Sequence, residues 1–125
     1  MKTTFFQAGF LALTLCAASV TAQPIPAQLH GLWGESKKVC AAMLKPNSMS
    51  ETGLTISAST VVIGMETSCG VQKGSRSDGK EFVAAYKCLV EGDTNVETFK
   101  LILLDANKLE MKGANGGEKY MKCVK

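Results

Sequence analysis

The stretch Glu81 to Glu91, EFVAAYKCLVE, constrains the fold more than any other part of the chain, because its residues alternate in character. One set of alternate positions forms an aromatic, apolar and cysteine-bearing face, namely Phe82, Ala84, Tyr86, Cys88 and Val90. Successive side chains of a strand point to opposite faces, so this stretch predicts a half-buried β-strand. Glycine-bearing turns flank it and strand-like runs lie beyond both turns, which predicts a central strand.

Further strand-like runs surround this one. They cover residues 54–58, 61–71, 96–104, 108–112 and 119–124, and segments rich in glycine, asparagine and aspartate separate most of them. Short, evenly spaced strands with turns between them favour an antiparallel meander. We therefore predict an all-β, mainly antiparallel domain of about 6–8 strands, closed into a small barrel or a sandwich.

Residues 1–22 have the organisation of a secretory signal. Lys2 gives a basic start, the stretch from Phe5 to Val20 carries no charge, and Val20-Thr21-Ala22 offers small residues for cleavage. The apolar stretch is short for a membrane span of roughly 20 residues. A retained anchor and a lipid on Cys16 are the alternatives. We expect a single mature domain, residues 23–125, that is periplasmic or secreted and has no membrane span.

Four cysteines remain in the mature chain: Cys40, Cys69, Cys88 and Cys123. An even number in a small exported domain predicts two disulfides. Three pairings are possible, and we favour Cys40–Cys69 with Cys88–Cys123, because the second bond would join the central strand to the last one. A zinc site is the alternative, but the closely spaced ligand pairs that zinc requires are missing from the sequence.

The first part of the mature chain predicts three features. Residues 23–30 hold two prolines and should form an extended arm. Trp33, which follows Gly31-Leu32, is typical of an aromatic plug beneath a sheet, with an exposed binding residue as the alternative. Residues 36–45 predict a short helix, because Ser36 can cap its start and Pro46 would end it; a strand is the alternative.

The residue types that catalysis requires are scarce. His30 is the one histidine and precedes the core, while the mature cysteines are assigned to disulfides. Four glutamates could supply a carboxylate pair, but the sequence brings no two of them together: Glu66, Glu81, Glu91 and Glu97. Loss of Lys2 with the signal lowers the net charge from +3 to +2, which is too mild for nucleic-acid binding. We expect no enzymatic activity, cofactor or metal.

Asp93, Asn95 and Glu97 alternate like the first ligands of a calcium loop. The sixth and twelfth positions of that loop require glycine and glutamate, and Thr98 and Leu104 stand there instead. We therefore expect a polar hairpin corner at this position.

Two polar, glycine-rich loops offer candidate residues for binding a partner, because rigid scaffolds present their binding residues on loops. The candidates are Arg76 and Asp78 in the loop 74–79, and Asn115, Gly116, Lys119 and Tyr120 in and after the loop 113–117. The expected partner is a protein of the cell envelope or of the extracellular space.

Two families share short motifs with this chain. Gly31-Leu32-Trp33 resembles the Gly-x-Trp opening of the calycin superfamily of lipocalins and small bacterial metalloprotease inhibitors, which implies a barrel that Trp33 plugs at one end. Tyr86-Lys87-Cys88 and residues 116–120 are similar to the aromatic-x-Cys strand and the Ser-Gly-x-Arg/Lys-Tyr loop of periplasmic lysozyme inhibitors of the membrane-associated type, although Gly116 stands in place of the serine. Trp33, the four cysteines and residues 88–92 also resemble small uncharacterised exported proteins of proteobacteria.

Together these features predict a non-enzymatic, exported binding module that inhibits a hydrolase, either a lysozyme or a protease. The alternatives are a carrier of a small apolar ligand and a structural protein of the envelope. In a barrel of this size we expect aromatic side chains to fill the interior, which disfavours a carrier. The oligomeric state is open.

Overall fold

The computed structural model describes residues 23–46, 50–72, 75–114 and 116–124, so the expected signal segment and the candidate Asn115 lie outside the described residues. The elements are, in chain order, η1 (Ala27–Leu29), β1 (Gly31–Gly34), α1 (Lys37–Leu44), β2 (Leu54–Ile56), β3 (Thr60–Ile63), β4 (Thr67–Val71), β5 (Arg76–Asp78), β6 (Glu81–Val90), β7 (Asp93–Asp105), β8 (Lys108–Gly113) and β9 (Gly116–Lys122). Within the described ranges, no helix is both long enough and apolar enough to cross a bilayer.

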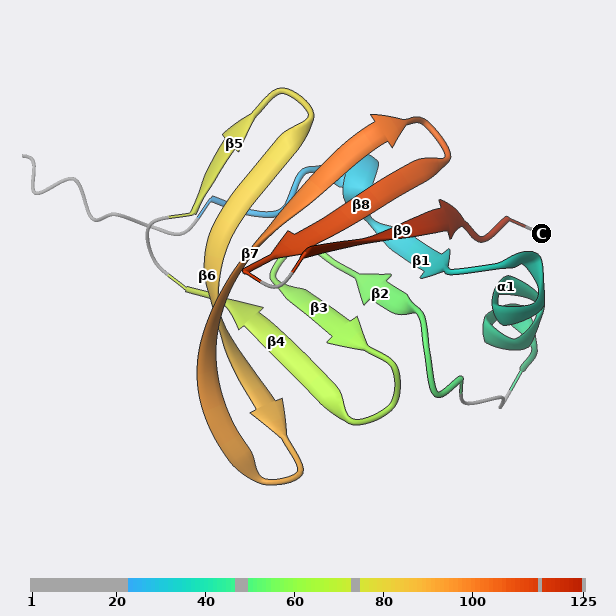
Figure 1. The fold of residues 1–125 in the computed structure, drawn as a ribbon, viewed down its shortest axis with the longest axis horizontal. Coiled ribbons are helices and arrows are strands. Elements are labelled where there is room, and N and C mark those ends of the chain that lie inside the picture. Colours follow the sequence, from blue (N-terminus) through green and yellow to red (C-terminus); the bar gives the residue numbers. More distant parts are fainter. Residues whose placement is uncertain (1–22, 47–49, 73–74, 115, 125) are drawn as a thin grey trace, which may run out of the picture.

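Eight strands close into an antiparallel barrel (Figure 1). Strands β1 to β4 pair in succession, as do β5 to β9. Two further pairings, β4 with β6 and β9 with β1, close the ring, and β5 lies outside it beside the first residues of β6. The predicted all-β meander is confirmed, and its form is a barrel.

The central strand of the prediction is β6. Its inner face alternates as expected, with Phe82, Ala84, Tyr86 and Cys88 buried. β7 pairs with it along one side, while β4 and β5 pair with successive parts of the other side. This long strand therefore joins the two halves of the meander.

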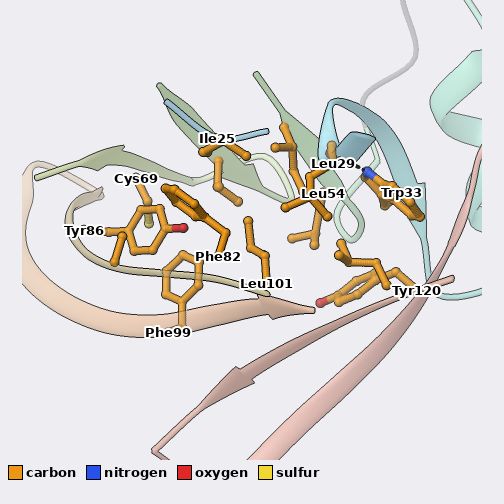
Figure 2. Close-up of a cluster of buried hydrophobic side chains, with 14 of the residues drawn as sticks. Ile25, Leu29, Trp33, Leu54, Cys69, Phe82, Tyr86, Phe99, Leu101 and Tyr120 are labelled. Atoms are coloured by element: carbon orange, nitrogen blue, oxygen red, sulfur yellow. Dashed lines mark hydrogen bonds between the residues drawn. The ribbon is translucent and has the colours of Figure 1, made fainter. Parts of the chain in front are cut away.

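Large side chains fill the barrel (Figure 2). Phe82, Tyr86 and Leu101 point toward one another from β6 and β7, and all three are fully buried. Trp33 is also fully buried, and its Nε1 donates a hydrogen bond of 2.9 Å to the Leu29 carbonyl, which agrees with an aromatic plug.

The lead-in segment closes one end of the barrel instead of forming only an extended arm. It makes the short helix η1, and it buries Ile25 and Leu29 against the core. The Ile25 N–H donates to the Ala58 carbonyl in the turn between β2 and β3, at 2.8 Å. The end of the barrel that carries this turn is therefore covered by the chain itself.

The segment 36–45 forms the helix α1, as predicted. The Ser36 hydroxyl accepts a hydrogen bond from the Val39 N–H at 3.2 Å, which caps the first turn. The helix ends at Leu44, two residues before Pro46, and packs beside β1.

The disulfides join Cys40 to Cys123 and Cys69 to Cys88, so the favoured pairing was wrong. The central strand is not tied to the last strand, because β4 is the neighbour of β6 and its register places Cys69 directly opposite Cys88. The two Cα atoms are 4.0 Å apart. Cys123 lies just after β9, where it meets Cys40 of α1.

Two segments differ from their predicted structure. The run 61–71 is a hairpin, because Gly64 adopts a left-handed φ of +60° and turns the chain between β3 and β4. Ile63 pairs with Thr67 across this turn. Side chains of β3 and β4 therefore follow one continuous alternation along the sequence, which hides the turn from a sequence reading. Residues 76–78 of the predicted loop form the strand β5.

Candidate functional site

The barrel end that bears the turns β3–β4, β6–β7 and β8–β9 is hollowed. A hollow of about 710 Å³ lies between β7 and the tip of the β8–β9 hairpin, and a second of about 550 Å³ lies on the β9 side toward β2. The two share Ile63 and Glu118. We call the residues that line them the mouth, and they are Glu35, Glu51, Thr52, Gly53, Ile63, Glu97, Thr98, Phe99, Met111, Gly113, Ala114 and residues 116–120.

The floor of the mouth is apolar. Phe99 is only 6% exposed and stacks on the Tyr86 ring, with centroids 3.8 Å apart. Ile63 and Met111 are half-buried and pack against the same core. The floor is therefore the outer layer of the hydrophobic core.

Two carboxylates stand on the inner faces of the strands above this floor. Glu97 alternates with the buried Phe99 on β7, and Glu118 alternates with the buried Tyr120 on β9, so both belong to the inward sets. Both side chains are exposed at the mouth. Among the described residues, neither pairs with a lysine or arginine. The mouth thus presents uncompensated negative charge over an apolar surface.

Tyr120 connects the mouth to the core. Its hydroxyl donates a hydrogen bond of 2.7 Å to Glu118 Oε2. Burial raises the pKa of Tyr120, and the hydrogen bond to Glu118 together with the negative charges of Glu118 and Glu35 raises this pKa further. The hydroxyl therefore remains a neutral donor that holds the Glu118 carboxylate in place.

Glu35 and Glu51 add two further carboxylates to the rim. Glu35 Oε1 accepts a hydrogen bond from the Gly53 N–H at 3.1 Å, which fixes the segment that enters β2. Lys119 also lines this part of the mouth. The rim is acidic on balance.

The two predicted binding loops lie apart. Gly116, Lys119 and Tyr120 belong to the mouth, whereas Arg76 and Asp78 lie on β5. β5 leads into the turn to β6 at the barrel end that the lead-in segment closes, and β6, β7 and β8 separate it from β9 in the sheet. The structure therefore brings the described candidates of the loop 113–117 together at the mouth and places those of the loop 74–79 outside the mouth.

Among the described residues, the histidine and the cysteines lie outside the mouth, whose titratable groups are four carboxylates, Lys119 and Tyr120. A ring nitrogen of His30 lies 2.6 Å from the Ile25 carbonyl oxygen, in the lead-in segment. All four cysteines of residues 23–125 are in disulfides. Within the described ranges, no three acidic, histidine or cysteine side chains are grouped so that they could hold a metal ion. What the mouth can do chemically is bind a cation that also carries apolar surface.

Sequence reasoning missed Glu97 and Glu118 as a pair. The signal was present, because Glu97 continues the period-two face of Phe99 and Leu101, and Glu118 continues that of Tyr120. Glu97 was instead assigned to a polar hairpin corner. The pairing with Glu118 depends on how the β8–β9 hairpin lies relative to β7, which no local pattern determines.

Comparison of the chain with protein-family models, with curated proteins and with solved structures found no significant match. The function therefore has to be argued from the chemistry of the site.

Proposed function

We propose that this protein is a non-enzymatic, exported binding module that uses its mouth to hold a protein partner, and that it acts as an inhibitor of a hydrolase, a lysozyme or a protease. The observation that carries the proposal is a rigid, filled barrel with one acidic, apolar-floored end. Such an end suits a basic surface that contributes a lysine or arginine with neighbouring apolar atoms.

The packing of the barrel favours binding at the mouth over transport of a ligand inside it. Trp33, Phe82, Tyr86 and Leu101 are fully buried and occupy the interior that a carrier would leave open. Two disulfides across a small β-domain support export, because such bonds form and persist in oxidising compartments.

An inhibition assay tests this function. The purified mature chain, with both disulfides formed, would be incubated with basic lysozymes and with serine and metalloproteases, and the residual hydrolase activity measured against concentration. We expect one hydrolase class to be inhibited, with the inhibition weakened by Glu118→Gln and by added salt because the contact is between charges.

Asp78→Asn provides the matched control, since Asp78 lies on β5, outside the mouth. This variant should inhibit as the parent does. Absence of inhibition across the panel would contradict the inhibitor assignment. Equal inhibition by Glu118→Gln and the parent would contradict binding through the mouth.

A further inference from the structure

In the part of the chain that the structure describes, the first part of β7 has a neighbouring strand on one side only. β6 pairs with β7 from Asp93 to Ile102, whereas pairing with β8 begins at Lys100. Among the described residues, no strand lies beside residues 93–99 on the β8 side. In Figure 1 the brown part of β7 curves past the end of β8, and no described strand runs along its outer edge. We call residues 93–99 the open edge.

The main-chain groups that face this open edge can be identified. The Leu103 N–H donates to the Lys80 carbonyl at 2.8 Å, just before β6 begins, and the register between β6 and β7 continues without a shift. Main-chain groups of successive residues in an antiparallel strand point to opposite neighbours. Odd-numbered residues of β7 therefore bond to β6, and Thr94, Val96 and Thr98 direct their N–H and C=O groups outward.

Another strand with a single neighbour is protected by the chain itself. Beside β5, the Gln23 side-chain carbonyl accepts a hydrogen bond from the Ser77 N–H at 3.0 Å, and the Gln23 main-chain carbonyl accepts one from the Ser75 hydroxyl at 2.9 Å. Lysine and proline are common protectors of strand edges, and residues 93–99 contain neither. The open edge is thus available to an added strand.

The inner side of the open edge selects the charge of that strand. Glu97 Oε2 lies 4.0 Å from Cys88 Sγ, so this carboxylate is turned toward the interior of the barrel. It lines the hollow of about 710 Å³ together with Glu118. A second copy of the chain docked edge to edge would bring further carboxylates to this side, and like charges on neighbouring strands repel. A basic segment would neutralise them.

The outer side of the same hairpin is apolar. Val96 is 69% exposed and Leu89 is 51% exposed, and the register sets Leu89 opposite Thr94, two residues before Val96. An added strand would run beside Val96 and cover it. Because side chains alternate, the segment that fits would carry lysine or arginine on its inner face and apolar residues on its outer face.

We propose that the open edge of β7 is the docking site for an extended basic segment of the partner protein. The segment adds as a further strand along Thr94, Val96 and Thr98 and directs a lysine or arginine toward Glu97 and Glu118. This inference rests on the proposed binding function and names the way in which the partner is held.

Nuclear magnetic resonance of the full chain with both disulfides intact tests the docking. The probe is a seven-residue peptide in which lysine and valine alternate, and the comparison peptide has glutamate in place of lysine. We expect the lysine peptide to shift the amide signals of Thr94, Val96 and Thr98 and to slow their exchange with solvent, because these groups gain hydrogen bonds. The glutamate peptide should bind at least about tenfold more weakly because of charge repulsion.

Main-chain variants separate the strand edge from its side chains. Val96→Pro removes an outward N–H while leaving the pairing with β6 intact, and should weaken peptide binding about tenfold. Val96→Thr retains the N–H and should bind within about threefold of the parent, since only a partly covered methyl group is lost. Glu97→Gln should weaken binding severalfold, and Asp78→Asn should leave it unchanged. If Val96→Pro does not fold, Thr94→Pro tests the same edge.

Several outcomes would overturn this inference. They are no binding of the lysine peptide, signal changes away from residues 93–99, unchanged binding by the proline variants, equal binding of the glutamate peptide, and a dimer that Val96→Pro converts to a monomer. Hydrolase inhibition that survives Val96→Pro would overturn the docking edge and leave the inhibitor function standing. Peptide docking without inhibition of any hydrolase would overturn the inhibitor function and leave the docking edge standing.

Discussion

At the scale of single residues, the two tyrosines of the chain differ in how their hydroxyls are satisfied. The Tyr86 hydroxyl is fully buried and has no hydrogen-bond partner among the described residues. The Tyr120 hydroxyl donates to Glu118 at the mouth. A buried polar group without a partner keeps the cost of its lost hydration, so the same chemical group stabilises the fold at one position and destabilises it at the other.

The conservative substitution Tyr→Phe should therefore act in opposite directions at these positions. Tyr86→Phe removes the unpaired hydroxyl and should raise the free energy of unfolding by about 1 kcal/mol. Tyr120→Phe, the matched control, removes a paired hydroxyl and should lower the free energy of unfolding by a similar amount, about 1 kcal/mol. Urea unfolding at constant m-value measures both changes. A loss of stability in Tyr86→Phe would show that its hydroxyl has a partner such as a bound water.

The tyrosines also set the behaviour of the fold at alkaline pH. Burial raises the pKa of Tyr86 and of Tyr120 above the ordinary value of 10.0, and the hydrogen bond to Glu118 raises the pKa of Tyr120 further. Above pH 10 the unfolded chain loses phenolic protons that the folded chain keeps, so the folded state binds more protons. The contribution of these groups to the free energy of unfolding is therefore constant below pH 10, and it falls as pH rises above 10.

We expect the free energy of unfolding, measured by urea titration between pH 8 and pH 11, to be flat at first and then to decline. Tyr86→Phe should make the decline shallower. A decline of the same steepness in Tyr86→Phe and in the parent would assign it to other groups.

At the scale of elements, the strands and the helix could be predicted because their signals are local. The alternation of β6 and the Ser36 cap of α1 each lie within one segment. The hairpin at Gly64 and the disulfide between Cys69 and Cys88 could not, because both depend on how strands meet. A three-residue turn preserves the phase of alternation, and no composition rule determines which strand lies beside β6.

The mouth of the barrel illustrates the same limit. Gly116 and Tyr120 could be named as candidates because glycine-rich hairpins are recognisable in a sequence, and both line the mouth. The open edge of β7 was not found, since it arises from a difference in length between two neighbouring strands: β7 begins at Asp93, but β8 accompanies it only from Lys100 onward. Such a mismatch is a property of the assembled sheet.

At the scale of the whole molecule, the barrel has one short strand pairing, between β1 and β9, which we call the seam, and a disulfide beside it. Strands β1 and β9 share only the pairs Trp33↔Lys122 and Gly34↔Met121, fewer than other neighbouring strands of the ring. The disulfide Cys40–Cys123 joins the residues that flank this seam, at a sequence separation of 83. A cross-link over a loop of that length stabilises by about 4.5 kcal/mol in the chain-entropy model, so the seam depends on it.

Reduction should therefore proceed in a definite order. Cys69 and Cys88 are both fully inaccessible, whereas Cys40 and Cys123 are each slightly exposed. We expect mild reduction of the folded protein to open Cys40–Cys123 first, and alkylation with peptide mapping to find labels at these two positions. Hydrogen exchange should then accelerate in β1 and β9 before β6. Simultaneous loss of both bonds, or earlier labelling of Cys69 and Cys88, would contradict this order.

The pairing of β1 with β9 also determines when, during synthesis of the chain, the barrel can close. Chains are made at about 5–20 residues per second, and contacts between distant residues form slowly because a long loop must close first. The strand Gly31–Gly34 is the first described strand to be made, whereas one of its two neighbours, Gly116–Lys122, is the last described strand to be made. The ring cannot close on a partial chain. The barrel therefore remains open until Gly116–Lys122 has been made.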